Sequence, residues 1–136
     1  MNVFHHEKLD VYQTSLELIV AADAIATQLA TGRGYLADQL RRAATSVALN
    51  IAEGAGEFSR KDKARLYRIA RRSATECAAV FDICMRLDLA AECDLHDARQ
   101  LVHRIVSMLT RIARVQSGTG TETDTETGSR DAIRLP

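Results

Sequence analysis

The sequence predicts an all-α protein, and within that class an antiparallel up-and-down four-helix bundle. The chain has one proline, Pro136, so every earlier position keeps the backbone N–H that a helix needs. Aromatic residues make up 4% of the chain, which gives it little β-sheet character. Apolar residues recur every three or four positions in four long segments, and this spacing gives each segment one apolar helix face. Four such faces joined by short connections bury one another most simply as antiparallel neighbours.

The first helix is predicted over residues 9–31. It ends at Gly32 and Gly34, because glycine adopts the positive φ that a helix exit needs. Its apolar stripe consists of Leu9, Tyr12, Leu16, Ile19, Ala22, Ala26 and Leu29. A second apolar group lies off this stripe and consists of Val11, Leu18 and Ile25. We expect this second group to contact other copies of the chain, since it adds apolar surface beyond one seam.

The second helix is predicted over residues 35–53, with Gly54 and Gly56 as its terminators. Its apolar stripe consists of Leu36, Leu40, Ala43, Val47 and Ile51. The third helix is predicted to start after Ser59, whose hydroxyl can accept a hydrogen bond from a free backbone N–H, with Asp62 three residues later. Its stripe consists of Leu66, Ala70, Cys77, Val80, Phe81, Cys84 and Leu87.

The fourth helix has the same start signal, with Asp94 followed by Asp97. Its apolar residues are Leu101, Ile105, Met108, Leu109 and Ile112. The bundle is therefore predicted over residues 9–115, after an N-terminal extension of residues 1–8. Residues 116–136 hold four acidic and two basic side chains, a net charge of −2, and almost no apolar residues. We predict a disordered C-terminal tail, because it cannot bury enough apolar surface to fold.

Cysteine usage and the N-terminus indicate a cytoplasmic protein. The three cysteines are spaced seven and nine residues apart, which matches neither a paired disulfide framework nor a C-x-x-C motif. The first ten residues lack the apolar region of a secretory signal. No apolar run is long enough to cross a membrane, so we expect no membrane partner.

Charged residues are balanced over the whole chain but segregated along it. Lys and Arg number 18, as do Asp and Glu, so the formal net charge is zero. Residues 60–72 hold seven basic side chains and one acidic one, a local charge of +6. One helix face carries four of these bases, the basic ridge: Lys61, Arg65, Arg68 and Arg72. Arg71 completes the candidate nucleic-acid-binding residues. Such a ridge contacts phosphates, or it is a solvated face whose charges pair with acids on a neighbouring helix or subunit.

The second predicted helix carries a smaller polar feature. Arg42, Ser46 and Glu53 fall within about 40° of one another on the helical wheel, and Asn50 borders the apolar face. Two interpretations are open: a hydrogen-bond ladder between helices or subunits, or a small polar site. We favour the ladder, because a buried polar network mainly specifies packing.

No catalytic or cofactor-binding pattern is present in the sequence. The histidines form neither H-E-x-x-H nor Glu-x-x-His, and the glycines form no phosphate loop. His96 and His103 are expected at the surface, and Cys77 and Cys84 are expected as core thiols because they follow the apolar stripe. We therefore predict no enzymatic activity, no metal site and no cofactor.

Two segments resemble a known protein family. Residues 39–54 read QLRRAATSVALNIAEG, and their most specific part is Asn-Ile-Ala-Glu-Gly at residues 50–54. Residues 67–76 read YRIARRSATE, with Arg72 where the family commonly has glycine. Both resemble the four-helix-bundle family of 23S rRNA-intervening sequence proteins, which is related to the accessory variability determinant proteins of diversity-generating retroelements. The resemblance covers roughly residues 8–115.

The resemblance implies a small cytosolic bacterial protein that forms a cyclic homo-oligomer, typically a pentamer. Family members include accessory proteins of diversity-generating retroelements, which bind nucleic acid and a reverse transcriptase. The family's polar positions, carried over to this chain, are Arg42, Ser46, Asn50 and Glu53 in the second helix and Arg68, Arg71, Ser73 and Glu76 in the third.

Two functions follow as hypotheses. The first is a non-enzymatic homo-oligomer that binds RNA or DNA through the basic ridge, as an accessory factor. Symmetry would turn a local charge of +6 into an extended positive field although each chain is neutral. The second is a structural adaptor for a protein partner, with the ridge used for assembly or partner contacts. Salt dependence distinguishes them, because nucleic-acid affinity falls steeply as counterions are released.

Overall fold

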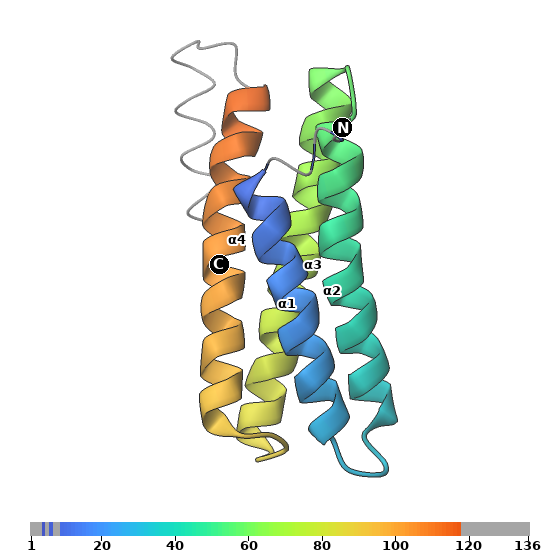
Figure 1. Cartoon of the computed structure of the whole chain (residues 1–136), viewed down its shortest axis with the longest axis vertical. Coiled ribbons are helices and arrows are strands. Elements are labelled where there is room, and N and C mark those ends of the chain that lie inside the picture. Colours follow the sequence, from blue (N-terminus) through green and yellow to red (C-terminus); the bar gives the residue numbers. More distant parts are fainter. Residues whose placement is uncertain (1–3, 5, 7–8, 118–136) are drawn as a thin grey trace.

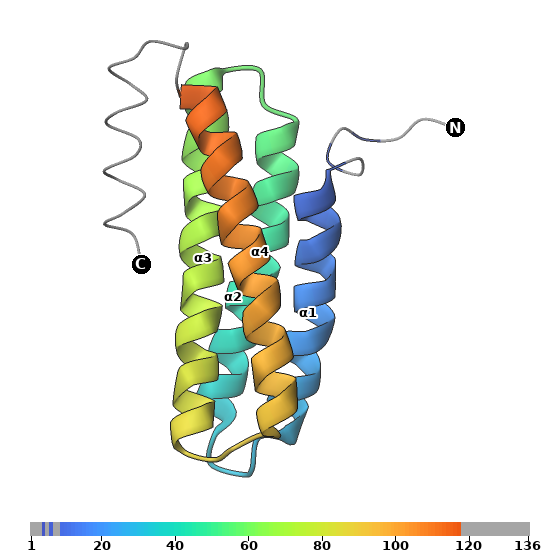
Figure 2. The same cartoon turned by 90° about the vertical axis from the view of Figure 1, so that its left-hand side faces the viewer.

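The computed structural model describes residues 4, 6 and 9–117, and this part of the chain is an all-α four-helix bundle (Figure 1). The helices are α1 (Asp10–Gln28), α2 (Gly34–Ala55), α3 (Arg60–Arg86) and α4 (Glu92–Ser117). They run up and down in antiparallel order (Figures 1 and 2). Each helix packs along the one before it, and α4 closes the bundle against α1. The predicted fold class is confirmed.

The helix boundaries follow local signals with small shifts. Ser59 caps α3 as predicted, its Oγ accepting a hydrogen bond from the Asp62 N–H at 3.3 Å. Gly32 has a φ of 97°, so the positive φ expected at this turn is present. The first helix stops at Gln28 instead of residue 31, and the fourth starts at Glu92, two residues before Asp94. α4 continues through Ser117, two residues into the predicted tail.

The prediction of a disordered tail covers residues 116–136. Gln116 and Ser117 belong to α4, and residues 118–136 lie outside the described residues, as does most of the predicted N-terminal extension.

The core uses the predicted stripes of α2 and α3. All five stripe residues of α2 are buried, and so are six of the seven on α3. The exception is Leu87, which caps the C-terminal end of α3 and is 46% exposed.

The core-facing stripe of α1 differs from the prediction. Its buried apolar residues are Val11, Leu18, Ala22, Ile25 and Ala26, whereas Leu16 is 37% exposed and Tyr12 and Ile19 are only partly buried. The group assigned to contacts between copies is therefore the core group. Val11, Leu18 and Ile25 are seven residues apart, the repeat that keeps one face turned toward neighbours in a supercoiled bundle. Both stripes of α1 are apolar, so periodicity along this one helix did not distinguish them.

Two polar residues also lie inside the bundle, on α1. Thr14 and Ser15 are buried, and their hydroxyls donate to the carbonyl oxygens of Asp10 at 2.9 Å and Tyr12 at 2.6 Å. These intrahelical bonds satisfy both groups at little cost, so they fit in a core that is otherwise apolar.

Gly54 brings α2 and α3 close together, a role different from the predicted helix termination. α2 runs through Gly54 to Ala55, and the N–H of Gly56 still donates to the carbonyls of Ala52 and Glu53. Gly54 is buried, and a Cβ on it would lie 2.6 Å from Cε1 of Tyr67 on α3. Only a residue without a side chain lets the Tyr67 ring lie this near the α2 backbone.

The substitution Gly54→Ala is expected to lower the free energy of unfolding by about 1–3 kcal/mol, because the new methyl group must displace a buried aromatic ring. Gly56→Ala is the matched control, since a Cβ there meets nothing nearer than 3.8 Å. Urea denaturation followed by circular dichroism measures both. A Gly54→Ala variant as stable as the parent would contradict the close approach.

Candidate nucleic-acid interface

The basic ridge is an exposed face on the N-terminal half of α3. Its four side chains all point away from the buried stripe of the same helix. From Lys61 to Arg72 the ridge is about 16 Å long, at about 1.5 Å per residue. Among the described residues, none of the four makes an ion pair or a side-chain hydrogen bond. The ridge therefore presents four cations to solvent.

Two other bases of this segment face the neighbouring helices. Arg71 is partly buried and its Nη1 donates to Oγ1 of Thr110 on α4, at 3.4 Å. Lys63 Nζ donates to the carbonyl oxygen of Ala55 at 3.2 Å, at the C-terminal end of α2, where a positive charge stabilises the free carbonyls. Arg71 thus lies on the α4 side of α3, beside the ridge and not on it.

Arg72, which replaces the glycine common in the family, lies on the ridge itself. Its side chain is exposed. A long charged residue is accommodated at this position because its side chain extends into solvent.

The end of α4 adds bases that sequence reasoning missed. Thr110 lies level with Arg71, and α4 runs antiparallel to α3, so Arg114 lies level with Tyr67, at the middle of the ridge. Arg111 and Arg114 are both exposed, but Arg111 lines the groove against α1. The proximity of Arg114 to residues 60–72 depends on helix pairing, and the sequence signal was only the presence of bases in the last turns of a predicted helix.

The family's polar positions divide into a seam between helices and an exposed pair. Ser46 Oγ lies 2.9 Å from Ser73 Oγ, and Asn50 Nδ2 donates to the carbonyl oxygen of Ser46 at 2.8 Å and to its Oγ at 3.1 Å. Gln39 Nε2 donates to Oε2 of Glu76 at 2.7 Å. The Ser46–Ser73 and Gln39–Glu76 contacts join α2 to α3, whereas the Asn50 contacts lie within α2.

The exposed pair is Arg42 and Glu53. Both side chains lie in solvent on α2, and neither makes a hydrogen bond or ion pair with any described residue. They do not belong to the seam.

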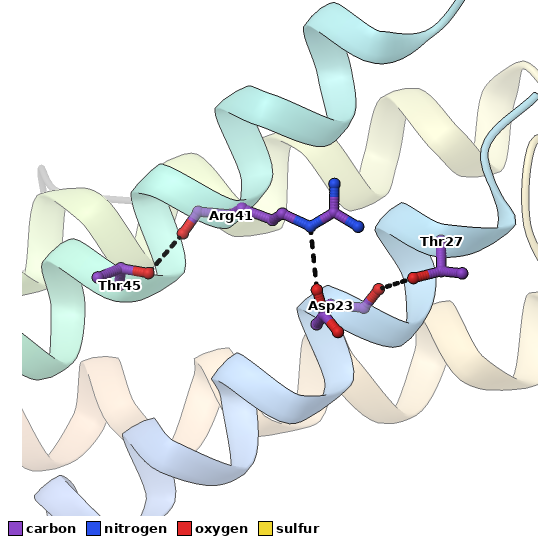
Figure 3. Close-up of polar contacts among 4 residues, drawn as sticks. All are labelled: Asp23, Thr27, Arg41 and Thr45. Atoms are coloured by element: carbon purple, nitrogen blue, oxygen red, sulfur yellow. Dashed lines mark hydrogen bonds and ion pairs between the residues drawn. The ribbon is translucent and has the colours of Figure 1, made fainter. Parts of the chain in front are cut away.

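A salt bridge sets the register of α1 against α2 (Figure 3). Arg41 Nε lies 3.0 Å from Oδ1 of Asp23, and the hydroxyls of Thr27 and Thr45 donate to the main-chain carbonyls of these two residues. Counting back from Asp23 along α1 and forward from Arg41 along the antiparallel α2 puts Leu16 about level with Leu49.

This register assembles an apolar surface between α1 and α2. Leu16 is 37% exposed, Leu49 57% and Val20 71%. We call these three residues the α1–α2 patch. The α1–α2 patch, and not the buried group of Val11, Leu18 and Ile25, is the apolar surface that this face exposes to solvent.

A groove between α1 and α4 has a volume of about 520 Å³. Acidic Asp10 and Glu17 line one wall, and basic Arg104 and Arg111 line the other. His103 and Ser107 also line the groove, but no hydrogen bond joins them in the described part of the chain. The groove therefore has mixed charge and no assembled nucleophile and base.

The thiols and imidazoles occupy the expected places. Cys77 and Cys84 are buried and Cys93 is exposed. Burial raises the pKa of the Cys77 thiol to about 12, with a further contribution from the Glu76 carboxylate, and burial also raises the pKa of Cys84. His96 and His103 are exposed, and the described residues include no cluster of three groups suited to a metal ion.

Comparison with known proteins identifies a family and similar solved structures. A sequence profile described as "23S rRNA-intervening sequence protein" matches residues 7–111. A crystal structure of a protein of unknown function from the S23 ribosomal protein family of Bacteroides thetaiotaomicron is similar in fold, with a TM-score of 0.70 and 23% sequence identity. The similarity covers 76% of this chain and 97% of that one.

No curated protein matches the chain. Among the described residues, no helix is long and apolar enough to cross a membrane.

The seam gives a prediction about stability. Ser46→Ala and Ser73→Ala are each expected to lower the free energy of unfolding by about 1 kcal/mol, because each removes the hydrogen bond between the two partly buried hydroxyls. The double variant is expected to lose less than the sum, since one shared hydrogen bond is removed twice. Thr45→Ala, an exposed hydroxyl on the same helix, is the control. Additive effects in a urea-denaturation cycle would argue against a coupled pair.

Proposed function

Because the chain belongs to the family of 23S rRNA-intervening sequence proteins, and because its basic ridge is exposed, we propose that it is a non-enzymatic, homo-oligomeric protein that binds nucleic acid through this ridge. The proposal places it in the cytoplasm, since its cysteines form no disulfide. It acts as an accessory factor, and a reverse transcriptase or another protein is the further partner class that the family resemblance suggests.

The observation that carries the proposal is the clustering of unpaired cations on one face of α3. Elsewhere on the surface, Arg41 and Arg99 form ion pairs with Asp23 and Asp82, and Arg42 on α2, unpaired among the described residues, is not part of a basic cluster. The four ridge cations form none with the described residues, although they lie within three turns of one helix. Clustered like charges repel one another, so this arrangement costs stability unless an anionic partner offsets it.

Phosphate is the anion that such a ridge fits best. Four bases separated by about 4.5–6 Å along α3 match a polyanion with closely spaced charges better than a single carboxylate. Arg114 near the end of α4 lies at the same end of the bundle and adds positive charge there, whereas Arg111 lines the groove against α1. The ridge consists of Lys and Arg, which contact the phosphates of any sequence, so the expected binding follows shape and charge more than sequence.

Assembly would multiply the ridge. The α1–α2 patch supports a contact between copies, because exposed apolar residues on adjacent helices gain by being buried. α3 lies diagonally across the bundle from α1, so a contact through this patch leaves the ridge uncovered. A cyclic oligomer, pentameric by family resemblance, would display one ridge per subunit.

The double charge reversal Lys61→Glu with Arg65→Glu is expected to abolish binding of a short RNA hairpin or a DNA duplex at low salt, while the circular-dichroism spectrum and the oligomeric mass stay unchanged, since exposed charges contribute little to folding. Fluorescence anisotropy measures the affinity. For the parent, four phosphate contacts per chain predict a slope of log K against log salt of about −3.6 on duplex DNA.

A matched control comes from the far end of the same helix. Arg86 is exposed like Arg65 but lies outside the ridge, so Arg86→Glu alone is expected to reduce binding much less than Arg65→Glu alone. Equal losses, or a parent that binds neither probe at low salt, would refute nucleic-acid binding by the ridge. A double variant that falls to monomers would make the ridge an assembly surface and favour the adaptor function.

Light scattering is expected to give a mass several times 15.0 kDa for the parent chain. Leu49→Glu is expected to lower this mass, because it places a charge in the α1–α2 patch. Leu87→Glu, at an exposed leucine outside the patch, is the control and is expected to leave the mass unchanged. A monomeric parent at micromolar concentration would refute assembly, and an unchanged mass for Leu49→Glu would exclude this patch.

A further inference from the structure

The described part of α4 ends beside the basic ridge. Thr110 lies level with Arg71, as their 3.4 Å contact shows, and α4 then runs on toward the N-terminal end of α3. Ser117 is seven residues further on, about 10 Å along the axis, which puts it level with Arg65. The C-terminal end of α4 and the N-terminal end of α3 lie at the same end of the bundle in both views (Figures 1 and 2).

The sequence that follows is chemically suited to the ridge. Residues 121–127 read TETDTET, in which three acids alternate with threonine and no base is present. In an extended chain alternate side chains point the same way, so Glu122, Asp124 and Glu126 would present carboxylates about 6.6 Å apart on one side. The ridge bases lie about 4.5–6 Å apart along α3, a similar interval.

The acidic segment is also within reach. Glu122 is five residues beyond Ser117, a span of up to about 17 Å when extended. Packed helices have axes about 8–10 Å apart, so a chain leaving α4 passes onto the outer face of α3 within this length. This length is sufficient for the three acids to reach the ridge between Lys61 and Arg72.

We propose that residues 121–127 of the chain's own C-terminal segment occupy the basic ridge and compete there with nucleic acid. This inference rests on the proposed function, because it describes how nucleic-acid binding by the ridge is regulated. The ion pairs are exposed to solvent and each contributes little, so the contact is loose and leaves bundle stability nearly unchanged. The contact still competes with free nucleic acid, because the segment is tethered to the bundle and therefore has a local concentration on the order of millimolar at the ridge.

The first arm of the test measures competition in the full chain. Neutralising the segment with Glu122→Gln, Asp124→Asn and Glu126→Gln is expected to tighten binding of the same RNA hairpin at least about threefold at about 20 mM salt. The gain is expected to vanish at about 0.3 M salt, where charges are screened within a few ångströms. The control replaces Thr121, Thr123 and Thr125 by serine, which keeps the charges and is expected to bind like the parent.

The second arm detects the contact without nucleic acid. In NMR spectra of the full chain at low salt, neutralising the three acids is expected to shift the arginine Nε–H signals of Arg65, Arg68 and Arg72. The signal of Arg86, at the far end of α3, is expected to stay in place. Unchanged ridge signals would overturn the inference even if affinity rose, because removing distant negative charge also favours a polyanion.

The two proposals fail differently. If the parent and the neutralised variant bind RNA equally at low salt, the inference is overturned while the proposed function stands. If neither chain binds nucleic acid but the ridge signals shift, the proposed function fails and the contact between the segment and the ridge is supported.

Discussion

The close approach of α2 and α3 is the constraint on which the rest of the structure depends. Gly54 lets the Tyr67 ring lie against the α2 backbone, and the Ser46–Ser73 and Gln39–Glu76 contacts fix how the two helices align. Once α3 is held at this depth and rotation, its apolar stripe faces the core. The ridge cations, on the opposite face of α3, then extend into solvent. The steric requirement of one glycine therefore bears on the electrostatics of the opposite face of α3.

The surface charges fall into two groups with different physical roles. Ion pairs such as Arg41–Asp23 and Arg99–Asp82 connect neighbouring helices and set register, although exposure limits what each contributes to stability. The basic ridge has no such partner among the described residues and so adds self-repulsion to the folded state. A neutral chain with one unpaired positive face favours association with anions while keeping long-range attraction to other molecules modest.

Polar groups inside the bundle follow a similar division. Thr14 and Ser15 donate their hydroxyl hydrogens within α1, and Thr14 Oγ1 also accepts a hydrogen bond from Arg104 Nη2 on α4, at 3.5 Å. The Ser46 and Ser73 hydroxyls form a hydrogen bond with each other between α2 and α3. This directional bond helps to fix the register of the two helices, which apolar contacts alone specify less well. The pKa of Cys77 is raised because its thiol is buried in the apolar core, where the charged thiolate is disfavoured. Reactive thiol chemistry is thus confined to Cys93 at the surface.

Sequence reasoning correctly predicted the four helices, the α3 cap at Ser59, the apolar stripes of α2 and α3, and the outward basic ridge. Each of these features depends only on residues that lie within a single helix. The sequence did not determine which of two apolar stripes on α1 faces the core, since Val11, Leu18 and Ile25 compete with Leu16 and Ile19 and only packed neighbours decide between them. It also misassigned Gly54, whose partner Tyr67 is on another helix. The nearness of Arg114 and Ser117 to the ridge was likewise decided only by tertiary structure, because antiparallel pairing brings together residues about 50 positions apart that no local pattern connects.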